Sequence, residues 1–151
     1  MRLDYTKVSP GGVKVCGSVY GYVVQSGLEE DLIDLVYLRV SQINGCAYYL
    51  DLHTRDLIDR GMPSSKLALL QAWREVGTVF STRERCALAW AESVTRVAQT
   101  HVPDAVFDTA IAVFNDKELV DLTIAVGLMN IYNQLAISFR RVPENALPRK
   151  N

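Results

Sequence analysis

The sequence predicts an all-α protein, a helical bundle of about seven helices, and three observations support this fold class. Apolar residues recur at three- and four-residue spacing in successive segments, which is typical of amphipathic helices. Residues that start or stop helices separate these segments. No segment alternates like a strand, and the sequence has neither a glycine-rich phosphate loop nor an internal repeat. We expect a single domain over residues 1–151 with a core over about residues 9–141, because the hydrophobic fraction of 49% suits one core of this size.

Three helices are predicted in the first part of the chain, over residues 10–25, 29–42 and 46–60. Ser9 and Pro10 supply the N-cap and the first helical residue of the first helix, although four glycines weaken it. Acidic residues in the first turn favour the second helix, because they complement the positive end of its dipole. Gly61 is expected to end the third helix.

Four more helices are predicted, over residues 64–75, 82–99, 103–114 and 117–140. Ser81 with Glu84 and Asn115 with Glu118 have the spacing of capping boxes. The last helix is apolar nearly all round, which indicates either full burial or a membrane span. Asp121 and three amide side chains interrupt its apolar run. We therefore expect this helix to be buried, partly against another subunit, and we expect no membrane contact.

The candidate chemistry lies in one stretch, SQINGCAYYLDLH. The dipeptide Asn44-Gly45 predicts a turn, because both residues tolerate positive φ. Cys46 then falls in the first turn of a helix, where backbone N–H groups and the helix dipole favour a thiolate. Tyr49 and His53 follow at spacings of three and four residues, so all three side chains share one helix face. Since Cys46 and His53 are separated by roughly 10 Å of helical rise, they must communicate through position 49 or through water.

Several segments together carry a resemblance to a known family: residues 35–48, 51–54, 81–90, 101–103, 117–122 and 130–139. They resemble the core of the AhpD-like alkylhydroperoxidase branch of the carboxymuconolactone decarboxylase family. The resemblance covers most of the chain. It implies a helical bundle that assembles into a homo-oligomer, either a dimer, a trimer or a hexamer.

Family members with peroxidase activity carry a Cys-x-x-Cys pair, a histidine four residues later, and an acidic residue twelve positions before the first cysteine. Carried over by position, the resemblance implies that Cys46 is the first cysteine, His53 the histidine and Asp34 the acidic residue. Tyr49 stands in the place of the second cysteine. In the family the second sulfur is taken to attack the hydroperoxide, and the first then resolves the sulfenic acid as a disulfide. This dithiol cycle cannot run inside the present motif.

Three functions follow as hypotheses. The first is a thiol-dependent peroxide reductase of the antioxidant type, in which Cys46 acts alone and His53, Asp34 and Tyr49 relay protons. It implies a small hydroperoxide as substrate, an external thiol or dithiol reductant as partner, and no bound cofactor. The second is a catalytically retired oligomer with a binding or regulatory role, in which Tyr49 fills the space of the lost sulfur. The third is lactone decarboxylation, the other family chemistry, which no constellation in the sequence specifically supports.

The other cysteines and histidine have simpler interpretations. Cys16 lies on the apolar stripe of the first helix, as a small hydrophobic residue or as a replacement for the missing resolving thiol. Cys86 falls in the middle of a helix, so structural burial is expected. No metal site is predicted, because His101 is the only other histidine and no cysteine or second histidine stands at ligand spacing.

Composition excludes several classes of partner and compartment. The formal net charge of -1, without a basic stripe, gives no electrostatic footprint for nucleic acid. The N-terminal residues lack the apolar region of a signal peptide. Three scattered cysteines do not form a disulfide framework. We therefore expect a cytoplasmic protein in a reducing environment.

Overall fold

The fold is all-α, as predicted. The computed structural model describes residues 1–143, and within these residues the regular structure is helical, without a strand. The α-helices are α1 (Tyr5–Val8), α2 (Pro10–Val24), α3 (Glu30–Asn44), α4 (Ala47–Asp59), α5 (Ser64–Ala68), α6 (Thr82–Thr95), α7 (Val97–Thr100), α8 (Asp104–Ile111) and α9 (Asp116–Ser138). Two short 3₁₀ turns, η1 (Leu70–Ala72) and η2 (Gly77–Val79), lie between α5 and α6. The residues from 144 onward lie outside the described part.

Two of the predicted helices are divided in the structure. The segment predicted over residues 64–75 splits into α5 and η1, and the side chain of Arg85 donates to the Trp73 carbonyl (3.0 Å). The segment predicted over residues 82–99 splits into α6 and α7. At that joint the Thr100 hydroxyl donates to the carbonyl of Ser93 (2.7 Å), so a side chain satisfies a carbonyl at the end of α6. In both segments a side chain from outside the divided helix satisfies a backbone carbonyl.

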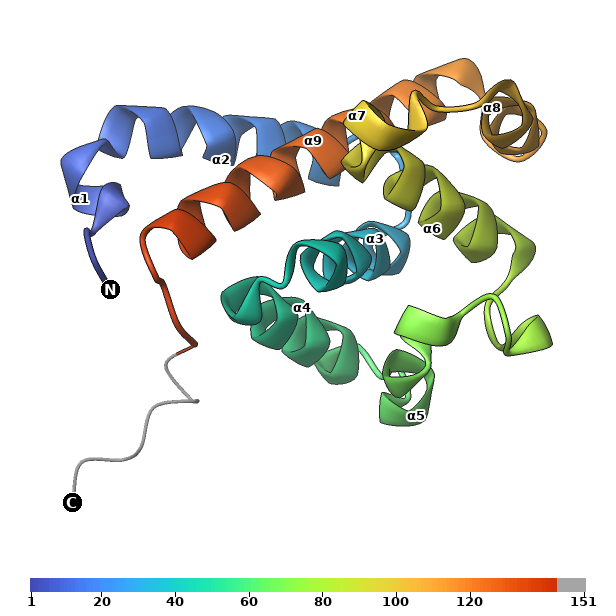
Figure 1. Ribbon diagram of the computed structural model, residues 1–151, viewed down its shortest axis with the longest axis horizontal. Coiled ribbons are helices and arrows are strands. Elements are labelled where there is room, and N and C mark those ends of the chain that lie inside the picture. The colour runs from blue at the N-terminus through green and yellow to red at the C-terminus, as the bar shows by residue number, and fades with distance from the viewer. Residues whose placement is uncertain (144–151) are drawn as a thin grey trace.

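Helix α3 is the central element of the fold. It contacts α4, α6 and α9, which surround it in Figure 1. Nine of its fifteen residues are buried. Their apolar side chains contribute to both hydrophobic clusters. One is shared with α2, α4, α6, α8 and α9, and the other is shared with α4, α5, η1 and α6. The polar side chains of α3 that are buried with them, Asp34 and Ser41, therefore face other helices rather than solvent.

Helices α2 and α9 lie side by side along one edge of the molecule (Figure 1). Helix α9 begins at the predicted capping box, in which Asn115 and Glu118 each accept from the other's backbone N–H. By length and composition alone α9 could span a membrane. In the structure nine of its residues are buried inside the chain, among them Asp121 and Asn133. Asp121 accepts hydrogen bonds from Tyr22 of α2 (2.8 Å) and from Lys117 (2.5 Å), which ties the two helices together.

A buried carboxylate joins α3, α6 and the segment after η1. Glu92 of α6 is 8% exposed and accepts from Arg39 of α3 (2.8 Å), from the indole of Trp73 (2.9 Å) and from Arg74 (2.5 Å). Burial alone would raise the pKa of the Glu92 carboxyl, but these three donors hold it below its usual range. Glu92 is therefore a charged junction between parts of the chain that are distant in sequence.

Candidate functional site

The predicted turn at Asn44-Gly45 is confirmed, and it positions Cys46. Helix α3 ends at Gly45, which adopts the left-handed conformation (φ 68°) that favours glycine. Cys46 is the N-cap of α4, and its backbone N–H donates to the Ser41 carbonyl (2.9 Å). The end of one helix and the start of the next therefore meet at this cysteine.

The sulfur of Cys46 is held in a buried environment, because the residue is only 1% exposed. Burial raises the pKa of the Cys46 thiol, and it outweighs the opposite effect of the backbone N–H groups of Tyr49 and Tyr48 and of the Asn133 amide. The start of α4 thus favours the Cys46 thiolate, as we expected. This effect is smaller than the desolvation penalty that burial places on the charged sulfur. The neutral thiol is the favoured form near neutral pH.

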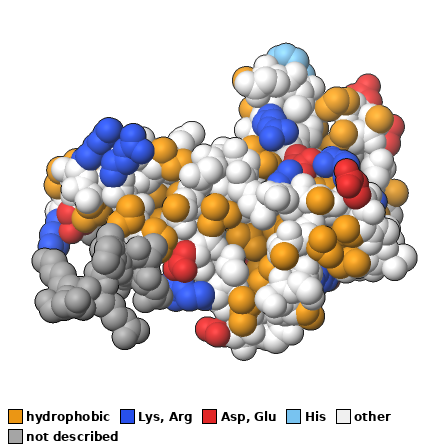
Figure 2. Space-filling view, turned by 60° about the horizontal axis from the view of Figure 1, so that its bottom comes forward, with side chains coloured by type: hydrophobic (Ala, Val, Ile, Leu, Met, Phe, Trp, Pro, Cys, Tyr) orange, Lys and Arg blue, Asp and Glu red, His pale blue; other side chains and the backbone are white. Residues whose placement is uncertain are grey.

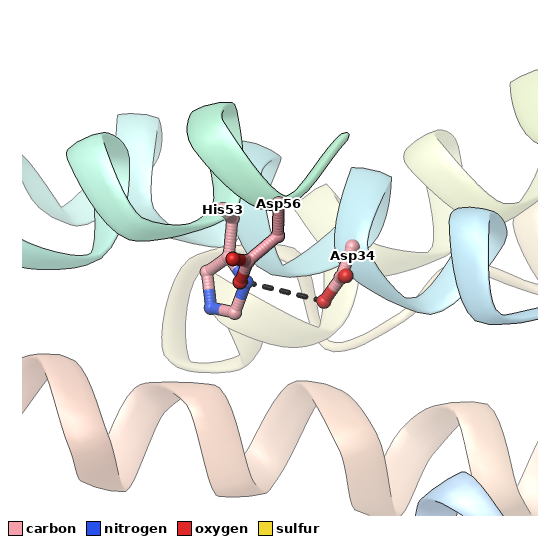
Figure 3. Close-up of side chains that lie close together, drawn as sticks. All are labelled: Asp34, His53 and Asp56. Carbon is pink, nitrogen blue, oxygen red and sulfur yellow. Dashed lines mark ion pairs between the residues drawn. The ribbon is translucent and has the colours of Figure 1, made fainter. Parts of the chain in front are cut away.

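His53 and Asp34 lie side by side in the structure. Asp34 comes from α3 and His53 from α4, and the two side chains point toward one another (Figure 3). His53 Nδ1 lies 3.1 Å from Asp34 Oδ1, and both side chains are less than a tenth exposed. Neither ring nitrogen of His53 makes a hydrogen bond of normal geometry with any residue in 1–143.

Arg60 was missed by the sequence reasoning, and it completes this pair. Its guanidinium binds Oδ2 of Asp34, the oxygen that faces away from His53, and also binds Asp31 (2.7 Å) and Glu30 (3.3 Å). Burial alone would raise the pKa of the Asp34 carboxyl, but His53 and Arg60 hold it below its usual range. Asp34 is therefore an ionised carboxylate that lies beside the imidazole. The signal that could have found Arg60 is its place at the end of α4, beside the acidic start of α3.

Tyr49 lies between His53 and α9. Its ring stacks on His53 (centroids 5.8 Å apart) and on Tyr132 of α9 (5.6 Å), while Tyr48 meets it edge-on (5.0 Å). Burial raises the pKa of the Tyr49 phenol well above its usual range, so the hydroxyl stays protonated. Tyr49 is thus one ring of an aromatic stack that joins α4 to α9.

Tyr37 of α3 is a second residue that the sequence reasoning missed. Its ring lies 5.1 Å from that of His53, it is fully buried, and its hydroxyl has no hydrogen-bond partner in residues 1–143. The signal that could have found it is its position three residues after Asp34, on the same face of the helix.

A cavity of about 330 Å³ opens beside Tyr48, between the N-terminal residues 1–6 and the residues that follow α9. Arg141 lies at its wall, 4.1 Å above the Tyr48 ring, and donates to the Tyr5 hydroxyl (3.0 Å). Because Tyr48 also contacts Tyr49, this cavity reaches the neighbourhood of the aromatic stack. A second, apolar groove of about 350 Å³ lies between α6, α8 and α9 and contains none of the predicted site residues.

The cysteines outside the motif are both unpaired. Cys16 on α2 is half-buried, and Cys86 on α6 is buried, with its sulfur 4.0 Å from the Thr109 carbonyl. The expected burial of Cys86 is confirmed. A resolving role for Cys16 stays a prediction, since in the structure it is a free thiol on another helix from Cys46.

The difference in burial predicts an order of thiol reactivity. We expect iodoacetamide to alkylate Cys16 at least about tenfold faster than Cys46 near neutral pH, because thiolate fraction and access limit the Cys46 reaction. The Cys46 rate should rise with pH as its thiolate fraction grows. Peptide mass mapping over a time course measures both rates, and the protein unfolded in urea is the control in which they converge. Equal rates in the folded protein would contradict this assignment.

The sequence of this chain is similar to those of known proteins. The sequence pattern of the carboxymuconolactone decarboxylase family matches residues 13–93. The uncharacterized protein YdfG of Bacillus subtilis (strain 168) is 30% identical over 137 residues, which cover 91% of this chain and 92% of YdfG. The uncharacterized protein YnjA of Escherichia coli (strain K12) is 32% identical over 107 residues, which cover 71% of this chain and 58% of YnjA.

Two solved structures share the fold. A protein of unknown function from Agrobacterium tumefaciens, proposed to be the antioxidant defence protein AhpD, superimposes with a TM-score of 0.90 and 39% identity, covering 94% of this chain and 97% of its own. An uncharacterized peroxidase-related protein from Silicibacter sp. TM1040 superimposes with a TM-score of 0.77 and 21% identity, covering 87% of this chain and 69% of its own. At that identity the second similarity shows the fold alone.

Proposed function

This chain belongs to the carboxymuconolactone decarboxylase family, and from that membership we propose that it is a thiol-dependent peroxide reductase of the AhpD type with one reacting cysteine, Cys46. The observation that carries the proposal is the buried pair of Asp34 and His53, oriented by Arg60. Burying a carboxylate and an imidazole with unpaired ring nitrogens opposes folding. An apolar packing would avoid this cost, so a role in proton transfer accounts for the pair better than packing does.

In the proposed reaction His53 serves as the proton acceptor for the Cys46 thiol. Tyr49 links the two, because it lies three residues after Cys46 and stacks on His53. Its hydroxyl stays protonated and can donate to a peroxide oxygen or to a bridging water. Asp34 holds the imidazole and stabilises the imidazolium that forms.

The Cys46 thiolate then attacks the terminal oxygen of a hydroperoxide, ROOH. A sulfur–oxygen bond forms, the O–O bond breaks, and the departing alkoxide takes a proton from the relay and leaves as the alcohol ROH. The sulfur is oxidised to sulfenic acid and the peroxide is reduced by the same two electrons. An external thiol condenses with the sulfenic acid and releases water, and a second thiol regenerates Cys46 as its own disulfide forms.

The substrate and the assembly follow from the surface. A small hydroperoxide would enter through the cavity beside Tyr48, which lies next to the aromatic stack.

We also propose that the protein is a homo-oligomer, because apolar side chains remain exposed on α2, α8 and α9. Figure 2 shows apolar side chains spread over one face. They include Val15, Tyr22, Phe107, Ile111, Val120, Ile124 and Ile131.

Trapping of the sulfenic acid tests the proposal. The protein is exposed briefly to tert-butyl hydroperoxide with dimedone, and adducts are counted by intact mass and located by peptide mapping. We expect one adduct at Cys46, its loss in Cys46→Ser, and its retention in Cys16→Ser. The rate of adduct formation should rise with pH, since the pKa of Cys46 is raised and the thiolate is the nucleophile.

Two observations favour a second candidate, a catalytically retired oligomer with a binding or regulatory role. The Cys46 sulfur is almost fully buried, and the Tyr49 ring occupies the position of the second sulfur. The same experiment separates the two functions. A folded protein that forms no adduct at any pH up to the raised thiol pKa contradicts the peroxidase proposal and supports the retired site.

A further inference from the structure

Three side chains with metal-ligand atoms converge between α3 and α4. Asp34 comes from α3, and His53 and Asp56 lie one turn apart on α4, with all three directed to one point (Figure 3). We infer that Asp34, His53 and Asp56 form a binding site for a divalent cation of the zinc class. Imidazole with carboxylates is a donor set that suits such ions.

The separations between the donor atoms match this coordination. His53 Nδ1 lies 3.1 Å from Asp34 Oδ1 and 3.9 Å from Asp56 Oδ2, and all three atoms fall within 4.8 Å of one another. Ligand bonds of about 2.0–2.2 Å in a tetrahedral site place neighbouring donors about 3.4 Å apart, between the two observed distances. The Asp56 side chain is 39% exposed, so a small rotation can close the longer distance.

An independent observation at the same point comes from the imidazole itself. The His53 residue is only 4% exposed. Its Nδ1 faces both carboxylates, but it makes no hydrogen bond of normal geometry with any residue in 1–143. Buried ring nitrogens are normally paired, and an unpaired one carries a free-energy cost. A cation at Nδ1 would remove that cost, with the ring proton on Nε2.

The charges around the point favour a cation. Four carboxylates lie here, those of Glu30, Asp31, Asp34 and Asp56, against the single guanidinium of Arg60 among the described contacts. Arg60 binds Oδ2 of Asp34 and leaves Oδ1 toward His53, so it orients the ligand oxygen as a supporting contact does in metal sites. The partly exposed Asp56 supplies an entry path from solvent. No metal site was expected from the sequence, because no second histidine or cysteine stands at ligand spacing from His53, and carboxylate ligands from two helices give no such spacing.

The site overlaps the proposed proton relay. An ion on Nδ1 and Oδ1 would separate His53 from Asp34, so zinc would slow peroxide reduction. The expected slowing of peroxide reduction rests on the proposed function, whereas the binding of zinc does not. Binding is therefore measured without peroxide, so a failure of the peroxidase proposal leaves the metal result unchanged.

Titration calorimetry with ZnCl₂ on the full-length protein, freed of metal with EDTA, tests the site. We expect saturable binding of one ion per chain. Asp56→Asn should weaken it at least about tenfold, as loss of a ligand does. The matched control is Asp59→Asn, which removes the same charge from an exposed position on the same helix and should change affinity less than about twofold.

Cobalt absorption excludes binding through the cysteines. Bound Co²⁺ should give visible d–d bands without a thiolate-to-metal charge-transfer band, since the proposed ligands are nitrogen and oxygen. Absence of saturable zinc binding would overturn the proposal. Equal affinity in Asp56→Asn, equal weakening in Asp59→Asn, or a thiolate charge-transfer band would overturn it as well.

Discussion

Replacing Tyr49 by cysteine is expected to raise peroxide turnover with a dithiol reductant at least about tenfold over the wild-type chain. The reason is the spacing that α4 imposes. Residues three apart at a helix start have Cα atoms roughly 5–6 Å apart, which is within disulfide range. The sulfur of Tyr49→Cys would stand beside His53, where the Tyr49 ring now stacks, and Cys46 would resolve its sulfenic acid inside the site.

The control for this variant is Tyr49→Ser, which leaves the same space without a sulfur. Both replacements remove the Tyr49 ring from its stack with Tyr132, so they should lose similar stability, about 3 kcal/mol as for other large-to-small core changes. Turnover of hydroperoxide is followed by consumption of the reductant, and the 46–49 disulfide by intact mass. If Tyr49→Cys turns over no faster than Tyr49→Ser, then Tyr49 is not what limits this site.

Removal of the Glu92 carboxylate is expected to lower the free energy of unfolding by about 3 kcal/mol, the lower end of the range for breaking a buried ion pair. Glu92→Ala would leave Arg39, whose side chain is 13% exposed, and the Trp73 indole without their acceptor. It would also disconnect α3 from the segment after η1. Urea unfolding followed by circular dichroism measures the change.

Two further variants test whether the loss of stability in Glu92→Ala comes from its buried hydrogen bonds and charge. Glu92→Gln keeps an acceptor of the same shape and should lose less than Glu92→Ala, because Trp73 retains a partner. Glu75→Ala removes an exposed carboxylate and should change the free energy of unfolding by less than about 0.5 kcal/mol. A loss in Glu92→Ala no greater than that in Glu75→Ala would show that the junction does not contribute to stability.

The helices could be predicted from local signals because helix starts and ends depend on neighbouring residues. The capping boxes at Ser81 and Asn115 and the turn at Gly45 all appear in the structure. The breaks after α5 and α6 could not be predicted. Near these segments Arg85 donates to the Trp73 carbonyl and Thr100 donates to the Ser93 carbonyl, contacts that local helix signals do not include.

Part of the candidate site was predictable, but its electrostatics were not. The helical spacing indicated His53 and the family resemblance added Asp34, and the structure places these two side chains side by side. The raised pKa of Cys46 depends on burial against other helices, and a local argument from the helix dipole could not supply it. The contact of Arg60 with Asp34 likewise depends on how the end of α4 packs against the start of α3.

The sparse burial of α2 has a dynamic consequence. Val23 is its one buried residue within the described chain, whereas α3 buries nine. Local unfolding of α2 therefore requires far less free energy than opening of α3, and its amide protons exchange with solvent deuterium first. Because α2 packs against α9, which carries Tyr132, each such opening gives solvent transient access to that side of the aromatic stack.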